Sequence, residues 1–302
     1  MTLTKITVLI PARNAAATLA ATLDSLVQQS WQDFAVLVVD DASNDRTAEV
    51  ARGYAPRLPI ELLSLTSNGG VAGALNAGLD RIATPYIARL DADDLAVPER
   101  LATQFAFLEA HPGIDVCGSV LEMFSDEPGS GTKLSPRHAH DAAIKTGLLQ
   151  QNTMAHPSIL VRRGFFDDVG RYDSRYDYAE DYELWCRGAL LGKSYANLQE
   201  PLTRYRLHRH QVSQQHRQVQ MERDMQVKRK YISALLGGAS PGIVAEFLSP
   251  MLAFTNRDVA VGVLRQSLPL LFKLGNIVPD QALYQEILDA CIARHLGDEA
   301  VA

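Results

Sequence analysis

The chain has 302 residues, of which 47% are hydrophobic and 21% are charged, and its formal net charge is −6. This length is enough for one large domain, or for one domain with an appendage. Acidic and basic residues are interspersed without a long basic run, so we expect no nucleic-acid partner. The three cysteines, Cys117, Cys186 and Cys291, lie far apart without metal-ligand spacing, which is typical of a reducing compartment.

The N-terminal apolar run, Ile6–Ile10, is too short for the core of a signal peptide with its cleavage site. No segment holds enough consecutive apolar residues to span a bilayer. We therefore expect a soluble, cytoplasmic protein, and attachment to the inner face of the membrane stays open.

Strand and helix patterns alternate through the first third of the chain. The strands are short apolar runs, and the helices carry apolar residues at helical spacing, such as Leu19, Leu23 and Leu26. The predicted strands are 6–10, 34–39, 60–65 and 86–90, and the predicted helices are 15–29, 47–52, 71–82 and 99–110. This order predicts an α/β fold with a mostly parallel sheet, helices on both faces, and ligands at the carboxyl ends of the strands.

The second half of the chain has a mixed pattern and then becomes helical. The predicted order is a strand at 116–124, a polar loop at 125–137, a helix at 141–149, a strand at 158–161, a helix at 181–191 and a strand at 202–207. After about residue 212 we expect only helices, separated by Pro241, Pro250, Pro269 and Pro279. We therefore predict one domain at 1–212 and a helical region at 213–302.

Three carboxylates follow the predicted fourth strand, in Leu90-Asp91-Ala92-Asp93-Asp94. Packing them together at a strand end is costly unless a cation holds them. Mg²⁺ or Mn²⁺ suits such a cluster, because these ions prefer oxygen ligands and commonly bind substrate phosphates. The alternative is a solvated acidic turn, because Asp is a frequent turn residue.

A second acidic stretch, Asp40 to Asp45, closes the predicted second strand. A carboxylate here can accept a hydrogen bond from a nucleobase or ribose. The alternative is an Asx turn with an N-cap for the next helix. We assign Asp41 to the ligand and Asp45 to the cap.

Two further loops adjoin these acids. Pro11-Ala12-Arg13-Asn14 follows the first strand without the Gly-x-Gly-x-x-Gly pattern of dinucleotide binding. Arg13 either approaches a phosphate or base, or lies at the surface of a turn. The small residues of Asn68 to Gly78 permit close approach of a ligand to a helix N-terminus, or tight packing of helix on sheet.

Glu180 and Asp181 open the predicted helix at 181–191. Acids at a helix N-terminus are either capping residues or, in a catalytic setting, a general base, and the helix would keep such a base ionised. At the other end of this helix, Gly192-Lys193-Ser194 resembles the end of a P-loop. The upstream glycine that a P-loop requires is missing, so we predict that Gly192 is the C′ residue of the helix.

Basic residues end the last predicted strand, in Arg204 to His210. Neutral His can bind a divalent metal ion, and Arg can clamp a diphosphate. The alternative is a basic strand edge that discourages aggregation.

Taken in order, six stretches resemble glycosyltransferase family 2 over about Ile6 to Ser213. They are Ile10-Pro11-Ala12-Arg13-Asn14, Val39-Asp40-Asp41-Ala42-Ser43, Asn68 to Gly78, Asp91-Ala92-Asp93-Asp94, Glu180-Asp181-Tyr182-Glu183-Leu184-Trp185 and Tyr205-Arg206-Leu207-His208. Each stretch is weak alone, and their order makes the resemblance specific. It implies a GT-A fold with a nucleotide-sugar half at about 1–124 and an acceptor half at about 125–212, and it says little about the helical region.

The resemblance also implies residue roles. Asp181 would be the general base, supported by Glu180, and the metal ligands would be Asp91, Asp93 and His208, with Asp94 as a further candidate. The cofactor would be Mn²⁺ or Mg²⁺. The residues expected to bind the nucleotide sugar are Pro11, Arg13, Asn14, Asp41, Asn68, Gly70, Asp91, Ala92, Asp93 and Arg206.

The implied activity is transfer of a sugar, with inversion, from a nucleotide-diphosphate sugar to an acceptor hydroxyl on a glycan, lipid-linked or protein acceptor. Surface polysaccharide or glycoconjugate synthesis is the expected setting. The alternatives are a metal-dependent sugar nucleotidyltransferase and a non-catalytic nucleotide-sugar-binding module. A glycoside hydrolase also uses two carboxylates, but it would need neither a metal ion nor a nucleotide pocket.

The helical region contains an amphipathic segment at Val259–Leu274, with Arg257, Arg265 and Lys273 among its apolar residues. It could contact a membrane or a partner subunit. We favour packing on the rest of the chain, because amphipathic helices usually face a core.

Overall fold

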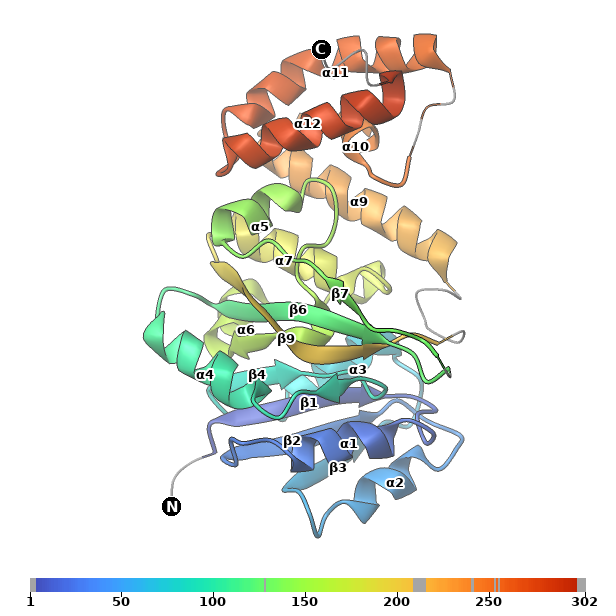
Figure 1. The fold of residues 1–302 in the computed structure, drawn as a ribbon, viewed down its shortest axis with the longest axis vertical. Helices are drawn as coiled ribbons and strands as arrows, with labels where there is room; N and C mark the ends of the chain where they lie inside the picture. Colours follow the sequence, from blue (N-terminus) through green and yellow to red (C-terminus); the bar gives the residue numbers. More distant parts are fainter. Residues whose placement is uncertain are drawn as a thin grey trace.

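In the computed structural model, residues 4–127, 129–208, 216–239, 242–252, 254 and 256–297 are described. The sheet and its helices form the lower part of the molecule in Figure 1, and α9 to α12 lie above it. The strands are β1 Ile6–Ala12, β2 Phe34–Asp40, β3 Ile60–Ser64, β4 Tyr86–Arg89, β5 Leu95–Ala96, β6 Val116–Phe124, β7 Lys133–Ser135, β8 Leu160–Arg162 and β9 Tyr195–Arg206. The first helices are α1 Leu19–Val27, α2 Thr47–Gly53, α3 Gly70–Leu79, α4 Arg100–Ala110, α5 Asp141–Gly147, α6 Arg163–Val169 and α7 Glu180–Leu190. The C-terminal helices are α9 Arg217–Leu235, α10 Gly242–Leu248, α11 Arg257–Gly275 and α12 Gln281–Leu296.

The described strands form one nine-stranded sheet in the order β3-β2-β1-β4-β8-β6-β9-β5, with β7 paired to β6. The first four strands in this order are parallel, and Ile6 of β1 lies in register with both Phe34 and Tyr86. β8 pairs antiparallel with both β4 and β6, whereas β6 and β9 are parallel. The predicted parallel order therefore holds through β4, and the second half of the sheet is mixed.

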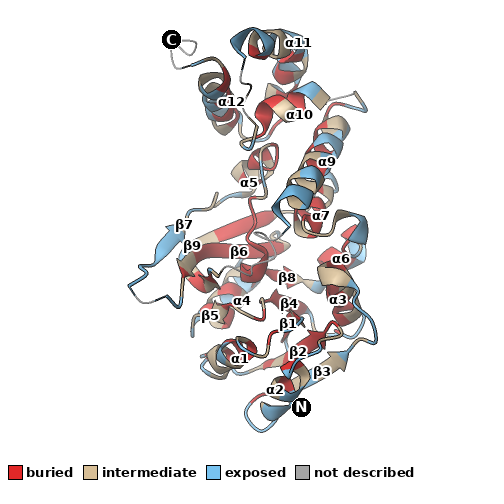
Figure 2. Cartoon of the chain, turned by 90° about the vertical axis from the view of Figure 1, so that its right-hand side faces the viewer, coloured by how far each residue is buried: buried red, intermediate tan, exposed pale blue. Residues whose placement is uncertain are grey.

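Helices cover both faces of the sheet, which Figure 2 shows as a largely buried layer. Successive side chains of a strand point to opposite faces. Ile6, Val8 and Ile10 accordingly pack in one cluster with α1 and α4, whereas Leu9 packs with α3 in the other. Each such buried side chain contributes about 1.5–3 kcal/mol of hydrophobic stabilisation, so both layers hold the sheet.

The strands and helices expected in the first third are present close to their predicted bounds. The helix predicted to end before Gly192 does so, because Gly192 has φ +77° and follows the C-cap residue Leu191. The features that were not predicted include α6, the short strand β5, the early start of β9 at Tyr195, and β7 within the expected polar loop.

The prediction that Pro269 separates two helices is wrong, because Pro269 lies inside α11. A proline removes one hydrogen-bond donor from a helix. Pro269 is exposed, so water can reach the carbonyl that loses its partner.

The C-terminal helices share a continuous apolar core with the sheet-bearing part. Val227, Ile232 and Leu271 belong to the same buried cluster as Leu148 and Trp185. Glu183 of α7, buried at the contact between α7 and α9, forms ion pairs with Arg187 at 2.7 Å and with Lys230 of α9 at 2.8 Å. The boundary predicted near residue 212 lies outside the described residues.

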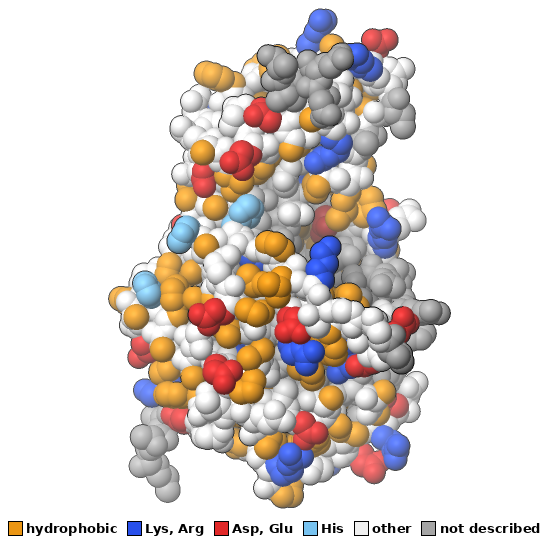
Figure 3. All heavy atoms as spheres, in the orientation of Figure 1, with side chains coloured by type: hydrophobic (Ala, Val, Ile, Leu, Met, Phe, Trp, Pro, Cys, Tyr) orange, Lys and Arg blue, Asp and Glu red, His pale blue; other side chains and the backbone are white. Residues whose placement is uncertain are grey.

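The segment Val259–Leu274 forms most of α11. Leu271 and Leu274 are buried against neighbouring elements, in agreement with the favoured packing, whereas Leu268 and Phe272 remain exposed. Within the described ranges, no helix combines the length and the apolar character that crossing a bilayer requires. Acidic and basic side chains are interspersed on the face of the molecule in Figure 3.

Candidate active site

The carboxyl ends of β1, β2 and β4 meet at one edge of the sheet, because these strands are parallel and adjacent. Asp41 follows β2, Asp91 follows β4, and α3 begins at Gly70 beside them. The N–H of Gly69 donates to Asp41 Oδ1 at 2.6 Å, so two of the predicted loops are joined directly. The edge that the strand order predicts as a ligand site is therefore an acidic one.

The acids after β4 form a compact cluster. Asp91, Asp93 and Asp94 each offer a carboxylate oxygen, and these atoms lie within 4.8 Å of one another. Asp94 is fully buried, and its Oδ2 has no hydrogen-bond partner among the described residues. Burial, with the neighbouring charges of Asp91 and Asp93, holds the pKa of Asp94 well above its usual range.

This donor set suits a divalent cation. Carboxylate oxygens are the ligands that Mg²⁺ and Mn²⁺ prefer, and a cation would relieve the repulsion among the acids. His208 extends the set, since its Nε2 lies 2.9 Å from Asp93 Oδ2. The orphaned oxygen of Asp94 and this histidine both fit the predicted metal site.

Arg89 is a counter-charge that the sequence analysis missed. Its guanidinium is buried and lies 2.5 Å from Asp91 in an ion pair. Arg100 of α4 donates to the carbonyl of Arg89 at 2.6 Å and holds this end of β4 in place. Burial lowers the pKa of Arg89. The charge of Asp91 and its hydrogen bond with Arg89 act in the opposite direction, and the pKa is raised on balance.

Arg206, at the end of β9, supports the acidic loop. Its backbone N–H donates to Asp94 Oδ1 at 2.8 Å, and its Nε donates to the carbonyl of Asp93 at 2.7 Å. A further nitrogen of the guanidinium pairs with Asp126. The structure thus places Arg206 beside the cluster, where it holds the loop in shape.

The residues expected around the nucleobase form a hydrogen-bonded pair of loops. The N–H of Asn14 donates to Ser43 Oγ at 2.9 Å, and Asn14 Oδ1 accepts from the N–H of Asn44 at 3.0 Å. Arg13 lies 4.0 Å from Asp41. Asp45 accepts from the N–H of Thr47, the first residue of α2, which agrees with its predicted capping role.

The remaining predicted donor residues lie at the same edge. Asn68 Oδ1 accepts from the N–H of Gly70 at 3.0 Å. Pro11 lies near the carboxyl end of β1, in register with Val39 of β2, and Ala92 is buried between the acids. Gly70 has φ +72°, and a Cβ there would lie 2.5 Å from Asp177 Oδ2. Asp177 in turn accepts a hydrogen bond from the N–H of Ala72, so it covers the first turn of α3.

Glu180 and Asp181 occupy the first turn of α7. Asp181 accepts hydrogen bonds from Asn152 Nδ2 at 2.6 Å and from the N–H of Tyr182 at 2.7 Å. Glu180 is buried, and its Oε2 meets no hydrogen-bond partner in the part of the chain that the structure describes. Neither acid acts as a simple surface cap.

Burial opposes the effect of the helix N-terminus, which was expected to keep the base ionised. Burial raises the pKa of Asp181, although the N–H of Tyr182, Arg89 and Asn152 oppose it. Burial and the neighbouring charge of Asp181 raise the pKa of Glu180 to about 8. Desolvation therefore outweighs the helix dipole at this position.

The acidic cluster and the acids of α7 face the same region. Burial raises the pKa of Asp91, and Asp93 and Asp181 raise it further while Arg89 opposes them. Arg89 also lowers the pKa of both Glu180 and Asp181, so it lies close to both groups of acids. The structure thus brings together acids that are about 90 residues apart in the chain.

Sequence reasoning missed several residues around Asp181. Asn152 donates a hydrogen bond to Asp181. Arg137, whose buried Nε has no partner within the described ranges, interacts electrostatically with Asp181. Asp224 of α9 also lies in its field. These residues come from separate loops and from the C-terminal region, and no local motif marks them.

A sheet of this order, with an acidic cluster after β4 and buried acids opening a later helix, defines the class of GT-A-type glycosyltransferases. The model of the family described as "Glycosyl transferase family 2" matches residues 7–170. The chain belongs to glycosyltransferase family 2.

Two curated relatives are also described as glycosyltransferases. AmsE of Erwinia amylovora, an amylovoran biosynthesis glycosyltransferase, is 34% identical over 185 residues, which are 61% of this chain and 68% of that protein. EpsE of Bacillus subtilis, described as a glycosyltransferase, is 32% identical over 207 residues, which are 67% of this chain and 73% of that protein.

Solved structures share the fold along most of the chain. TarS of S. aureus in complex with UDP-GlcNAc superposes with a TM-score of 0.62 at 19% identity, covering 95% of this chain and 83% of that one. The mannosyltransferase PcManGT of Pyrobaculum calidifontis, in complex with GDP-Man and Mn²⁺, gives 0.58 at 18% identity, covering 96% and 80%. The expected family, the GT-A fold with its helical C-terminal region, and the glycosyltransferase class are thereby confirmed.

Proposed function

We propose that this protein transfers a sugar, with inversion, from a nucleotide-diphosphate sugar to an acceptor hydroxyl. The observation that carries the proposal is the electrostatic proximity of a half-buried carboxylate, Asp181, to the acidic cluster Asp91-Asp93-Asp94. Similar folds that hold UDP-GlcNAc or GDP-Man support a nucleotide-sugar donor.

In this proposal Asp181 is the general base. It accepts the proton of the acceptor hydroxyl while that oxygen attacks the anomeric carbon from the face opposite the leaving group. The bond from the anomeric carbon to the diphosphate oxygen breaks, and its electron pair leaves with the nucleoside diphosphate. A raised pKa suits this role, because a base is most effective when its pKa approaches the working pH. Asn152 fixes the orientation of the carboxylate through its 2.6 Å hydrogen bond.

Asp91, Asp93 and His208 would hold Mn²⁺ or Mg²⁺, and the buried carboxylate of Asp94 would be a further candidate ligand. When bound, the ion supplies positive charge against the negative charge that develops on the departing diphosphate. Arg206 keeps the carboxylates in place by holding the backbone of their loop.

We assign the nucleoside to the edge formed by Asp41, Arg13 and the loop at Asn68–Gly70. Asp41 can accept a further hydrogen bond besides that from Gly69, and Arg13 is half-exposed, so both suit contact with a nucleobase and ribose. The acceptor would be a growing glycan of a surface polysaccharide or glycoconjugate. The name of AmsE, a biosynthetic enzyme of amylovoran, supports this class of acceptor.

A thermal-shift panel of nucleotide sugars, with and without Mn²⁺, tests the donor class. A ligand that binds only the native state stabilises it by about 2.7 kcal/mol at a hundred times its dissociation constant. We expect stabilisation that depends on Mn²⁺ in the wild type and is lost in Asp93→Ala. The exposed acid Asp126 is a poor control because it pairs with Arg206, so Glu222→Gln on α9 serves instead.

Product analysis separates the proposed reaction from its alternatives. Release of nucleoside diphosphate supports sugar transfer, whereas release of pyrophosphate would indicate a nucleotidyltransferase. Binding of a nucleotide sugar without turnover in any acceptor extract would indicate a non-catalytic binding module.

A further inference from the structure

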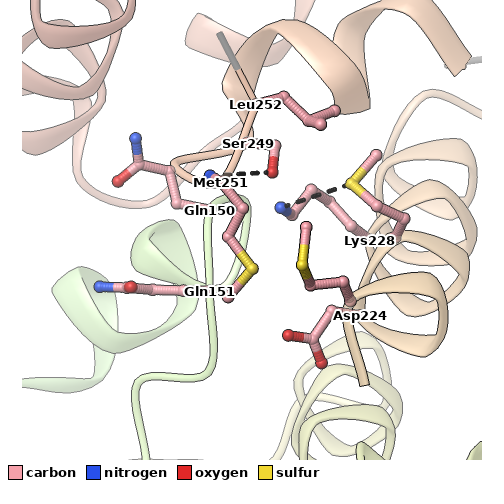
Figure 4. A pocket seen from close by; sticks show the side chains of 9 residues that line it. Gln150, Gln151, Asp224, Lys228, Ser249, Met251 and Leu252 are labelled. Carbon is pink, nitrogen blue, oxygen red and sulfur yellow. Dashed lines mark hydrogen bonds between the residues drawn. The ribbon is translucent and has the colours of Figure 1, made fainter. Parts of the chain in front are cut away.

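A small cavity lies where the C-terminal helices meet the rest of the chain (Figure 4). Its volume is about 20 Å³, which is enough for one water-sized group. Its walls come from the loop after α5, from one face of α9 and from the segment after α10. The lining residues are Gln150, Gln151, Met221, Asp224, Met225, Lys228, Ser249, Met251 and Leu252.

Lys228 is the unusual member of this lining. It is only 2% exposed, and its ammonium points into the space between α9 and the segment at 249–252 (Figure 4). Its nearest hydrogen-bonding neighbour is the thioether of Met225, at 4.0 Å. Within the described part of the chain Lys228 forms no ion pair, and burial lowers its pKa to about 8.

Asp224 lies one helical turn before Lys228 and lines the same cavity. Its carboxylate makes no hydrogen bond to any described residue, and burial, with the charge of Asp181, raises its pKa to about 7. The carboxylate of Asp224 and the ammonium of Lys228 interact electrostatically, but they are not within ion-pair distance. Each therefore has hydrogen-bonding capacity that a bridging group could use.

The cavity is adjacent to the proposed base. Gln151, which lines it, directly precedes Asn152, and Asn152 donates to Asp181 at 2.6 Å. The field of Asp181 acts on Asp224 from the same side. The loop at 150–152 thus links the wall of the cavity to Asp181, and Asp224 of α9 lies within electrostatic range of Asp181.

Charge decides which ligand fits. An anion would meet Lys228 but would be repelled by Asp224 and Asp181. A cation would be attracted by these two acids but repelled by the ammonium of Lys228, which points into the cavity. A neutral hydroxyl can donate to the carboxylate of Asp224 and accept from the ammonium of Lys228. The methionine and leucine side chains of the walls suit the C–H groups of a sugar, and methionine adapts its shape readily.

We propose that this cavity is an acceptor subsite, which binds a hydroxyl or hydroxymethyl group of a neutral sugar next to the hydroxyl that Asp181 activates. The inference rests on the proposed function, and it makes α9 of the C-terminal region part of the acceptor site. Asp224 and Lys228 would be specificity residues, and neither takes part in the chemistry.

The test uses the full chain and methyl glycosides as probes, namely the neutral glucoside, galactoside and mannoside beside glucuronic acid and glucosamine. Thermal shift reports binding without a donor, and nucleoside diphosphate release with a donor reports transfer. We expect at least one neutral glycoside to stabilise the wild type, and Asp224→Asn and Lys228→Met each to weaken that binding about tenfold or more. Arg229→Met, on the exposed side of the same helix, is the matched control.

The outcomes separate the two proposals. Donor affinity and the slow hydrolysis of the donor by water should stay unchanged in the control Arg229→Met, and donor affinity should stay unchanged in Lys228→Met. If only the charged sugars bind, if no neutral glycoside binds, or if binding is the same in Lys228→Met, the subsite is wrong and the cavity holds water only. If the wild type neither binds nor cleaves any nucleotide sugar, the proposed function itself fails, whatever the glycosides do.

Discussion

Asp181, the proposed base, accepts two hydrogen bonds that fix its orientation, and partial burial raises its pKa. Asp181→Asn keeps the shape of the side chain and removes the basic oxygen. We expect kcat to fall by about 10²–10⁴ while the dissociation constant of the donor stays the same. Steady-state kinetics and calorimetry measure the two quantities, and normal turnover would refute the assignment.

The neighbouring Glu180 should make stability depend on pH. Its pKa is about 8 in the folded protein against 4.5 as the ordinary value, so the folded state binds the proton more tightly. Its stabilising contribution is therefore complete below pH 4.5 and is lost as the pH rises through 8.

Glu180→Gln, which cannot ionise, should lose this dependence. Between pH 5 and pH 9, without metal ions, we expect the free energy of unfolding of the wild type to fall more than that of the variant, by about 1 kcal/mol or more. Urea titrations at the two pH values measure the difference, and parallel curves would contradict it.

How much of the site the sequence predicts depends on the residue. Asp91, Asp93 and Asp94 are adjacent in the chain and follow a clear strand, so the pattern locates their cluster. Arg89 is hidden in the same strand, because a buried arginine looks like an interruption of an apolar run. Asn152 and Asp224 reach Asp181 only through tertiary packing, which one sequence does not reveal.

At the scale of elements, α9 supports the start of α7. Tyr178 has φ +77°, a left-handed backbone conformation that costs a bulky residue about 1–3 kcal/mol. Gln220 of α9 donates to the Tyr178 carbonyl at 3.1 Å, and the ring of His216 stacks on Tyr178 at 4.5 Å. The strained residue leads directly into Glu180 and Asp181.

Gln220→Ala should therefore affect both stability and catalysis. We expect a loss of about 1 kcal/mol in the free energy of unfolding, typical of one hydrogen bond, and a lower kcat with unchanged donor affinity. Gln218→Ala, which removes an exposed side chain two residues earlier, is the control. A loss of stability with unchanged kcat would show that α9 does not position the acids.

The elements that sequence patterns missed have physical reasons. Pro269 is a helix-breaking signal that an exposed helix position tolerates. The first half of β9, Tyr195–Gln199, mixes apolar and polar residues because only part of it is covered, and its register with β6 shifts at Ser119 to Leu121. Neither feature follows from residue order alone.

At the scale of the whole molecule, the C-terminal helices are part of the folding unit, since their apolar residues complete one core with α5 and α7. Removing residues 213–302 would expose Leu148 and the surroundings of Trp185 to water. We expect the truncated chain to be insoluble or to unfold at a much lower temperature, as measured by soluble yield and calorimetry. A truncated chain with an unchanged midpoint would contradict the shared core.

Gly70 connects the two halves of the active site in a way that genetics can reveal. A methyl group at residue 70 would press on Asp177, and Asp177 leads through Tyr178 to the catalytic acids. A substitution at Gly70, in the loop that we propose binds the donor, would thus displace Asp177 and the neighbouring acids proposed to face the acceptor. Suppressors of a Gly70→Ala allele should include smaller residues at position 177. They would restore activity only in part, because no change elsewhere relieves the backbone penalty at φ +72°.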